Sequence, residues 1–299
     1  MGKIAFVFSG QGDQYPGMGK ALCQQYEAAA KVFRMCDSIR PGTSAQCFEG
    51  TSAELKETKN TQPCLFAMEL AAAAVLLDKG ITPDAVAGFS LGEVVAAAVA
   101  GCFDYETGFR LVCRRGELMQ LEAQKHDTAM AAVVKLTAGQ VQALCEKYPD
   151  IYPVNFNCPG NTTVSGLVSQ MPAFFADVKA AGGRVLPLKV KGAFHSPFMK
   201  EGADAFAAEL AKEDIRTGNI PLYANATAQP YGDDAAGLLS KQIASPVQWE
   251  RSIRNLIASG IDTFIEIGPG RTLTNMIQKI DTQVTAVTVT EYLTEGAVC

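Results

Sequence analysis

The sequence has little histidine and no arrangement of side chains typical of a metal site. Only two of its 299 residues are histidines, His126 and His195. None of the nine cysteines forms a C-x-x-C pair or joins a histidine-carboxylate cluster at metal-ligand spacing. The phosphate-binding P-loop and the dinucleotide fingerprint are missing as well. We therefore expect a protein that uses no metal ion and no cofactor.

An excess of positive charge is also absent. The chain has 26 Lys and Arg against 31 Asp and Glu, a net charge of −5, and no sustained basic run. This balance argues against a nucleic-acid partner. A hydrophobic content of 48% with 19% charged residues is typical of a globular enzyme, and the length allows one large core, with or without a subdomain.

A secretory leader and a membrane span are not indicated either. The N-terminal segment runs directly into an apolar strand pattern, without a signal core or cleavage site. The long apolar stretch 85–103 contains Glu93 and glycines, so a buried turn and helix explain it better than a span. We expect no membrane partner, and we expect the scattered cysteines, Cys299 included, to be reduced thiols of a cytoplasmic protein.

The pentapeptide 88–92 has the G-x-S-x-G pattern, with Ser90 at its centre. Residues 84–87 favour a short buried strand before it, and the alanine-rich 93–100 favours a helix after it. A serine on such a sharp turn projects its hydroxyl outward, and the helix aims free N–H groups at the place where an oxyanion would develop. An ordinary Gly-Ser-Gly turn is the alternative, but both flanking elements favour Ser90 as a nucleophile.

A serine nucleophile needs a base, and His195 is the better of two candidates. Histidine is the usual proton acceptor because its pKa of roughly 6.5 lies near working pH. His126 lies in a polar stretch that is typical of a solvated connector. His195 lies in a loop bounded by Gly192 and Pro197, between an expected strand and an expected helix, where catalytic groups concentrate. A histidine that bonds only its loop neighbours is the alternative.

Alternating strand and helix patterns predict an α/β fold with a largely parallel sheet. We expect strands at 3–8, 84–87, 221–225 and 261–267. Helices are expected at 18–37, 62–78, 104–121 with Asp104 as its cap, 197–212 and 247–259.

The middle of the chain has a β-α-β-β-α-β order, which is that of a ferredoxin-like unit. Its strands are expected at 128–134, 151–156, 162–165 and 184–190, and its helices at 137–147 and 169–181. We predict that residues 127–196 form an insert into a core made of residues 1–126 and 197–299. Ser90 and His195 would then lie on the walls of a cleft between the two parts.

Short motifs follow one another in a fixed order along the chain. They are FSGQG (8–12), TQP (61–63), GFSLGE (88–93), RG (115–116), NFN (155–157), FHS (194–196), PVQW (246–249) and EIGPG (266–270). With these motifs the chain resembles the malonyl-CoA:acyl carrier protein transacylases over nearly its full length. The resemblance implies an α/β-hydrolase-like core with the ferredoxin-like insert. It also implies transfer of malonyl from malonyl-CoA to the phosphopantetheine thiol of holo acyl carrier protein, in fatty acid biosynthesis.

The resemblance also implies roles for individual residues. Ser90 would accept the acyl group, with His195 as its base. Backbone N–H groups of Gln11 and Leu91 would form the oxyanion hole, and the backbone carbonyl of Gln248 would orient His195.

Other residues would bind the substrate. Arg115 would hold the free carboxylate of malonyl, although a surface arginine is the alternative when the sequence is taken alone. Met119 lies one helical turn after Arg115 on the same face. Gln62 would line the pocket or merely start a helix, and Asn157 would bind substrate or merely shape a turn. Phe194 would crowd a branched α-carbon, which predicts malonyl over methylmalonyl.

Three further expectations concern a residue substitution, the partner and the rival functions. Phe89 stands where the family usually carries histidine, which removes a polar group beside the nucleophile. The basic residues 184, 189, 191 and 200 are expected near His195, where they would steer an acidic carrier protein or would simply be solvated. Rival functions are a serine thioesterase or hydrolase, a free-standing acyltransferase of a polyketide assembly line, and a silent scaffold.

Overall fold

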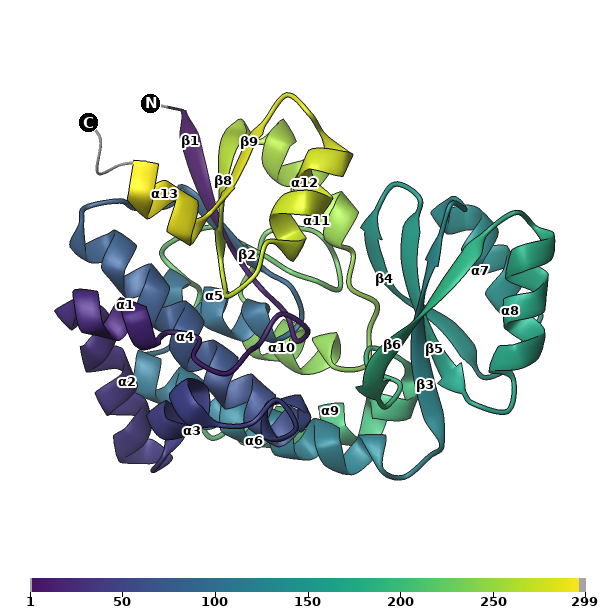
Figure 1. The fold of residues 1–299 in the computed structure, drawn as a ribbon, viewed down its shortest axis with the longest axis horizontal. Coiled ribbons are helices and arrows are strands. Elements are labelled where there is room, and N and C mark those ends of the chain that lie inside the picture. Colours follow the sequence, from purple (N-terminus) through teal and green to yellow (C-terminus); the bar gives the residue numbers. More distant parts are fainter. Residues whose placement is uncertain (1, 296–299) are drawn as a thin grey trace.

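The computed structural model describes residues 2–295, and the chain forms two lobes that are each built on a sheet of their own (Figure 1). The larger lobe carries a five-stranded sheet of order β7-β2-β1-β8-β9. All of its neighbouring strands pair in parallel. Its strands are β1 (Lys3–Phe8), β2 (Ala85–Gly88), β7 (Leu222–Tyr223), β8 (Ile261–Ile267) and β9 (Thr285–Thr288).

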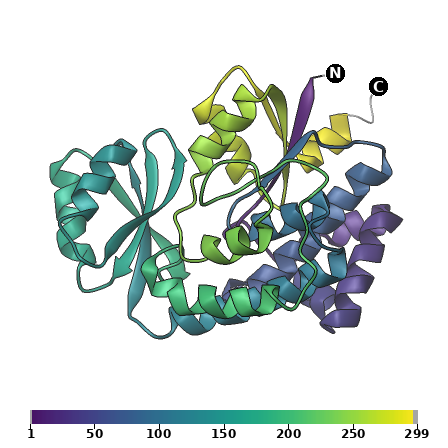
Figure 2. The ribbon, with the colours of Figure 1, turned by 180° about the vertical axis from the view of Figure 1, so that it is seen from behind.

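Helices cover both faces of this parallel sheet (Figures 1 and 2). They are α1 (Lys20–Gln25), α2 (Glu27–Ile39), α3 (Thr43–Glu49), α4 (Thr58–Asp78), α5 (Leu91–Ala100), α6 (Tyr105–Ala123), α9 (Lys200–Leu210), α10 (Ala235–Gln242), α11 (Trp249–Ala258), α12 (Thr272–Ile280) and α13 (Val289–Glu295). Short 3₁₀ turns precede α4 at Glu54–Lys56 and α9 at Pro197–Met199.

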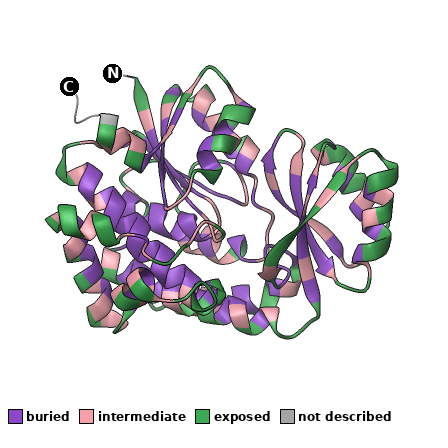
Figure 3. Ribbon diagram, in the orientation of Figure 1, coloured by how far each residue is buried: buried purple, intermediate pink, exposed green. Residues whose placement is uncertain are grey.

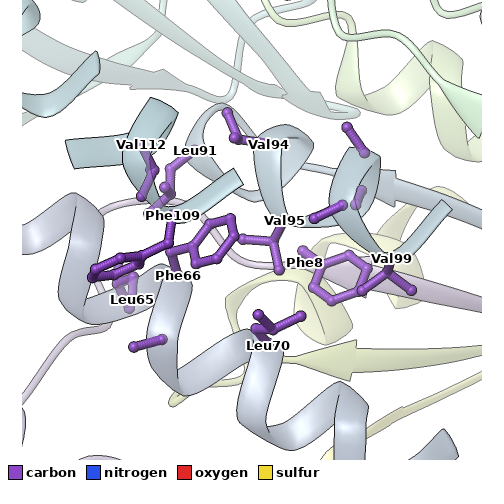
Figure 4. Packing of buried hydrophobic residues seen from close by; sticks show 14 of the residues in the cluster. Phe8, Leu65, Phe66, Leu70, Leu91, Val94, Val95, Val99, Phe109 and Val112 are labelled. Atoms are coloured by element: carbon purple, nitrogen blue, oxygen red, sulfur yellow. The ribbon is translucent and has the colours of Figure 1, made fainter. Parts of the chain in front are cut away.

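The core of the larger lobe lies between the sheet and helices α4, α5 and α6. Every residue of α5 is buried, because the helix is almost entirely apolar and has neighbours on all sides (Figure 3). Phe66 and Phe109 pack beside Val95 where the three helices meet (Figure 4). Among residues 2–295, one helix, α4, is long and apolar enough to cross a membrane, but 83% of its apolar window is buried in the fold, as in a core helix.

The smaller lobe is an antiparallel sheet of order β4-β5-β3-β6. Its strands are β3 (Thr128–Val134), β4 (Ile151–Cys158), β5 (Asn161–Leu167) and β6 (Arg184–Lys191), and its helices are α7 (Ala138–Cys145) and α8 (Met171–Ala180). The predicted β-α-β-β-α-β order is confirmed, and both helices lie on the face away from the larger lobe (Figure 1). Thr137 starts α7 with a complete capping box.

Several expected elements differ from those observed. The single helix predicted over 18–37 is two helices, because Tyr26 is extended at φ −131° between them. Helix α4 begins at Thr58 rather than Gln62. The strand expected at 221–225 is only two residues long. The sequence analysis did not foresee α3, α10, α12, α13 or β9.

The cysteines of the described residues are all free, and most of them are buried in apolar surroundings. Cys299 lies outside the described residues.

Candidate active site

Ser90 stands on the turn between β2 and α5, as predicted. Its backbone has φ 54° and ψ −107°, a conformation that L-residues rarely adopt. The flanking glycines are required by space. A Cβ on Gly88 would lie 1.9 Å from the backbone carbon of Gly92, and one on Gly92 would lie 2.2 Å from the Phe8 carbonyl oxygen. The pattern G-x-S-x-G is therefore a packing requirement of this turn.

Asn225, which was not predicted as a site residue, holds the turn through hydrogen bonds from the segment after the neighbouring strand β7. Its Oδ1 accepts from the Ser90 N–H at 2.7 Å, and its Nδ2 donates to the Gly88 carbonyl at 2.5 Å. The residue is 1% exposed. It lies two residues after the end of β7, and β7 pairs with β2, so the parallel sheet brings Asn225 to the strained turn. No local pattern in the sequence indicates this contact.

His195 meets Ser90 across 105 residues of sequence. Its Nε2 lies 2.7 Å from Ser90 Oγ, and its Nδ1 lies 2.9 Å from the carbonyl oxygen of Gln242. A carbonyl only accepts, so Nδ1 carries the proton and Nε2 is left to accept from the serine hydroxyl. Burial lowers the pKa of His195 to about 4, and the Arg115 charge acts in the same direction. The imidazole is therefore neutral at working pH, as a base must be.

The carbonyl that orients His195 belongs to Gln242, so the prediction of Gln248 is wrong. Gln248 precedes α11, and its N–H donates to the Asn225 carbonyl at 2.8 Å. Gln242 is the last residue of α10, and carbonyls in the last turn of a helix lack partners within the helix. The Gln242 carbonyl also accepts from the Ser245 N–H at 3.2 Å. Because α10 was not expected from the sequence, the role of this carbonyl could not be foreseen.

Arg115 lies wholly inside the protein beside the nucleophile. Its Nη2 is 3.4 Å from Ser90 Oγ and donates to Gln242 Oε1 at 2.6 Å, while Nη1 donates to Gln62 Oε1 at 2.7 Å. Burial lowers the pKa of Arg115 to about 10, and the nearby Glu93 opposes that shift. The surface-arginine alternative is wrong, because Arg115 is 0% exposed.

Two other predicted substrate residues lie around the guanidinium. Gln62 is buried and donates from Nε2 to the sulfur of Met119 at 3.3 Å. Both side chains therefore lie next to Arg115, as expected. Gln62 has its amide oxygen turned to Arg115, so it helps to orient the guanidinium.

The two predicted oxyanion residues lie on different segments, Leu91 at the start of α5 and Gln11 on the loop after β1. Leu91 is the first residue of α5, and the first N–H groups of a helix have no partner within it. Gln11 follows Gly10, which packs against the backbone of Phe89 next to Ser90. Phe89 itself points away toward Trp249, with ring centroids 5.5 Å apart.

The remaining predicted residues lie at different distances from the centre. Phe194 is 7% exposed and directly precedes His195. Asn157 belongs to β4 of the smaller lobe, where its Nδ2 donates to Asn161 at 3.1 Å and Thr163 at 3.0 Å. It lines a cleft of about 280 Å³ together with Gln11 and Phe89. Asn157 therefore shares a cleft with Gln11 and with Phe89, the residue before Ser90.

A larger cleft of about 910 Å³ also reaches Gln11. Lys189 and Lys191 line it, together with Lys56, Lys125 and the exposed His126. The other two predicted basic residues lie elsewhere. Lys200 pairs with Asp204 at 2.6 Å, and Arg184 stands at the opposite end of β6 from Lys191.

Comparison with known proteins identifies the family to which this site belongs. Residues 5–294 match the model of the acyl transferase domain. The chain belongs to this family. The acyltransferase is 36% identical to the malonyl CoA-acyl carrier protein transacylase of Bacillus subtilis, over 97% of this chain and 94% of that one. It is 34% identical to the enzyme of that name in Escherichia coli, over 97% of both chains.

Solved structures give the same result for the fold. The acyltransferase superposes with a TM-score of 0.95 on a malonyl CoA-acyl carrier protein transacylase of Clostridium perfringens, with 31% identity over 99% of this chain and 97% of that one. A type II polyketide malonyl-transacylase in complex with its acyl-carrier protein matches with a TM-score of 0.92 and 31% identity, over 96% and 95% of the chains. The α/β fold with its second sheet is therefore confirmed.

Proposed function

We propose that this acyltransferase moves a malonyl group from malonyl-CoA to the phosphopantetheine thiol of holo acyl carrier protein, in fatty acid biosynthesis. The observation that carries the proposal is the buried charge of Arg115 beside Ser90. Its hydrogen-bond acceptors among the described residues are the neutral amide oxygens of Gln62 and Gln242 and the hydroxyl of Ser90. A buried cation without a bonded anion favours a substrate that brings its own carboxylate. The names of the relatives support the same substrate.

The first half-reaction forms an acyl-enzyme. Ser90 Oγ attacks the thioester carbon while its proton passes to His195 Nε2, which lies 2.7 Å away. The carbonyl oxygen becomes an oxyanion that the N–H groups of Leu91 and Gln11 stabilise. The carbon–sulfur bond then breaks, coenzyme A leaves as the thiol with the proton from His195, and malonyl remains on Ser90.

The second half-reaction runs the same steps in reverse with a different thiol. The phosphopantetheine thiol gives its proton to His195 and attacks the malonyl-serine ester. The oxyanion forms at the same place, the ester bond breaks, and Ser90 recovers its proton. Phe194 beside His195 limits the room at the α-carbon, which supports malonyl over methylmalonyl as the acyl group.

The proposed organisation follows the lobes. Residues 1–126 and 197–299 would form the catalytic core and 127–196 the insert, with the carrier protein entering along the cleft that Lys189 and Lys191 line. We place the enzyme in the cytoplasm, where buried free thiols stay reduced. A polyketide assembly line is the second candidate pathway, because a relative from Bacillus velezensis that is named as a polyketide biosynthesis transacylase is 35% identical over 95% of this chain.

Intact-mass measurement after mixing with malonyl-CoA tests the proposal. The wild-type protein should gain one malonyl group and lose it when holo carrier protein is added, and Ser90→Ala should gain none. Label that persists in Ser90→Ala would exclude Ser90 as the nucleophile. Label that disappears in buffer without a carrier protein would indicate the rival thioesterase.

A further inference from the structure

Glu93 is a buried charged residue to which the proposed mechanism gives no part. It lies in the first turn of α5, three residues after Ser90, and is 0% exposed. The spacing S-x-x-E ordinarily forms a capping box, in which the glutamate accepts the N–H of the serine. Here Asn225 accepts that N–H instead, at 2.7 Å. The Glu93 carboxylate is therefore turned away from its own helix end.

The carboxylate of Glu93 accepts hydrogen bonds from three neighbours. Oε2 accepts from Gln242 Nε2 at 2.7 Å, and Oε1 accepts from the Tyr231 hydroxyl at 2.6 Å and from the Asn225 N–H at 3.0 Å. All three neighbours donate, so the site suits the ionised carboxylate, which only accepts. The positive end of α5 favours the same charged form.

Gln242 links this carboxylate to the substrate side of the site. Its Nε2 donates to Glu93 and, at 2.6 Å, to the Ser90 carbonyl, while its Oε1 accepts from Arg115 at 2.6 Å. A carboxylate can only accept and a guanidinium can only donate. Of the two orientations of the amide, only one satisfies both neighbours. Glu93 and Arg115 therefore select the same orientation from opposite ends of one side chain.

We propose that Glu93 is a positioning residue, which holds the Arg115 guanidinium through the Gln242 amide in the orientation that binds the substrate carboxylate. The inference rests on the proposed function, because it concerns a substrate that carries a carboxylate. Without the negative charge, the amide of Gln242 can turn over and present its NH₂ group to Arg115. The guanidinium would then lose an acceptor and its fixed position beside Ser90.

Glu93 titrates in a pH range where its effect on the position of Arg115 can be measured. Burial raises the pKa of Glu93 to about 7, against the hydrogen bonds from Tyr231, Gln242 and Asn225 and the charge of Arg115. The titratable or charged groups around it are Arg115 from α6, Tyr231 from the segment after β7, and His195 beyond Gln242. Arg115 stays charged, Tyr231 stays protonated and His195 stays neutral near pH 7. Glu93 is the member of this group that changes charge there.

The test compares acylation of Ser90 by malonyl-CoA and by acetyl-CoA, which lacks the carboxylate, in the absence of carrier protein. In Glu93→Gln the preference for malonyl should fall at least about tenfold, the effect of one lost charge-assisted hydrogen bond. In the wild type the preference should decline as the pH falls through about 7, and in Glu93→Gln it should not vary with pH. If Glu93→Gln keeps both the malonyl preference of the wild type and its pH dependence, the proposal is overturned.

Two controls separate positioning from general damage. Glu122→Gln removes another buried carboxylate, on α6 and paired with Lys125 at 2.8 Å, and should leave the malonyl preference unchanged. In a double-mutant cycle with Gln242→Ala, adding Glu93→Gln should cause no further loss, because Glu93 acts through that amide. A further, additive loss would show that Glu93 does not act through the Gln242 amide.

Should Glu93→Gln fail to fold, the malonyl preference of Gln242→Ala decides, since it should not vary with pH. Failure of the proposed function is distinguishable, because wild-type Ser90 would then take no malonyl.

Discussion

His195 is the residue whose environment departs most from what its sequence surroundings indicate. As a loop histidine it would titrate near 6.5, but burial and the Arg115 charge lower its pKa to about 4. His195 is therefore protonated, and unable to act as a base, only at acid pH. The neutral form contributes stability fully above about pH 6.5, and that contribution is lost as the pH falls through about 4.

The pH profile of acylation tests this shift. With an uncharged activated ester, the rate at Ser90 should stay level as the pH falls from neutral and should decrease with an apparent pKa near 4. An uncharged ester avoids the titration of Glu93, because it makes no use of Arg115. An acid limb near 6.5 would contradict the environment described for His195.

Glu69 is a second residue whose burial has a measurable consequence. It is 0% exposed on α4, and neither carboxylate oxygen has a hydrogen-bond partner among the described residues. Burial raises its pKa well above the ordinary value, and the carboxylates of Glu266 and Asp13 add to the shift. A carboxyl with a raised pKa stabilises the fold below the ordinary value near 4.5 and loses that contribution as pH rises.

Glu69→Gln should therefore stabilise the protein, and more so at higher pH. We expect a gain in the free energy of unfolding of at least about 1 kcal/mol at pH 8, because no charge then has to be buried. Thermal unfolding at pH 5 and pH 8 measures the difference. Glu122→Gln is the comparison, because that carboxylate is paired with Lys125 and its loss should not stabilise. Equal midpoints for Glu69→Gln and the wild type at pH 8 would disprove the interpretation.

At the scale of elements, the turn between β2 and α5 depends on a partner from the segment that follows the neighbouring strand β7. Asn225 bonds both the Ser90 N–H and the Gly88 carbonyl, and the Ser90 side chain itself makes no capping hydrogen bond to α5. Asn225→Ala should lower the free energy of unfolding by about 1–3 kcal/mol for each buried group left unbonded. It should also slow acylation, because the strained backbone of Ser90 is released.

Asn255→Ala, which removes a bond to the Ala228 carbonyl, is the matched control. The Asn255→Ala variant should be less stable than the wild type but should still be acylated at Ser90. Equal loss of acylation in both variants would contradict a specific role for Asn225.

The same elements show which features could be predicted from the sequence. The turn at Ser90, the cap at Asp104 and the capping box at Thr137 were predictable, because each is specified by residues within a few positions of one another. Gln242 could not be predicted. Its bonds reach His195, Arg115 and Glu93, which lie 47, 127 and 149 residues away. The short helix α10 that carries it has too few residues to show a clear periodicity.

At the scale of the whole molecule, the two lobes have different tasks. The larger lobe holds Ser90 and the buried Arg115, and they meet the buried His195 where the chain returns from the smaller lobe, so these groups are in place before any substrate arrives. The smaller lobe contributes β6, an edge strand whose residues are mostly exposed (Figure 3). Lys189 and Lys191 near its end face the cleft that reaches Gln11. In a chain of net charge −5, these lysines are a local exception that suits an acidic partner.

Charge reversal at this edge should separate the two half-reactions. Lys189→Glu with Lys191→Glu should lower the rate of transfer to carrier protein by about tenfold or more at low salt, because steering by charge governs association. The defect should shrink as ionic strength rises, since salt screens exposed charges. Formation of malonyl-Ser90 from malonyl-CoA should be little changed. Lys147→Glu with Lys179→Glu changes the net charge equally and should leave both half-reactions intact. Lys147 follows α7 and Lys179 lies in α8, and these two helices cover the outer face of the smaller lobe (Figure 1). If both double variants lose the same rate of transfer, net charge and not this edge is responsible. If the Lys189/Lys191 double variant loses both half-reactions equally, β6 supports the catalytic centre itself.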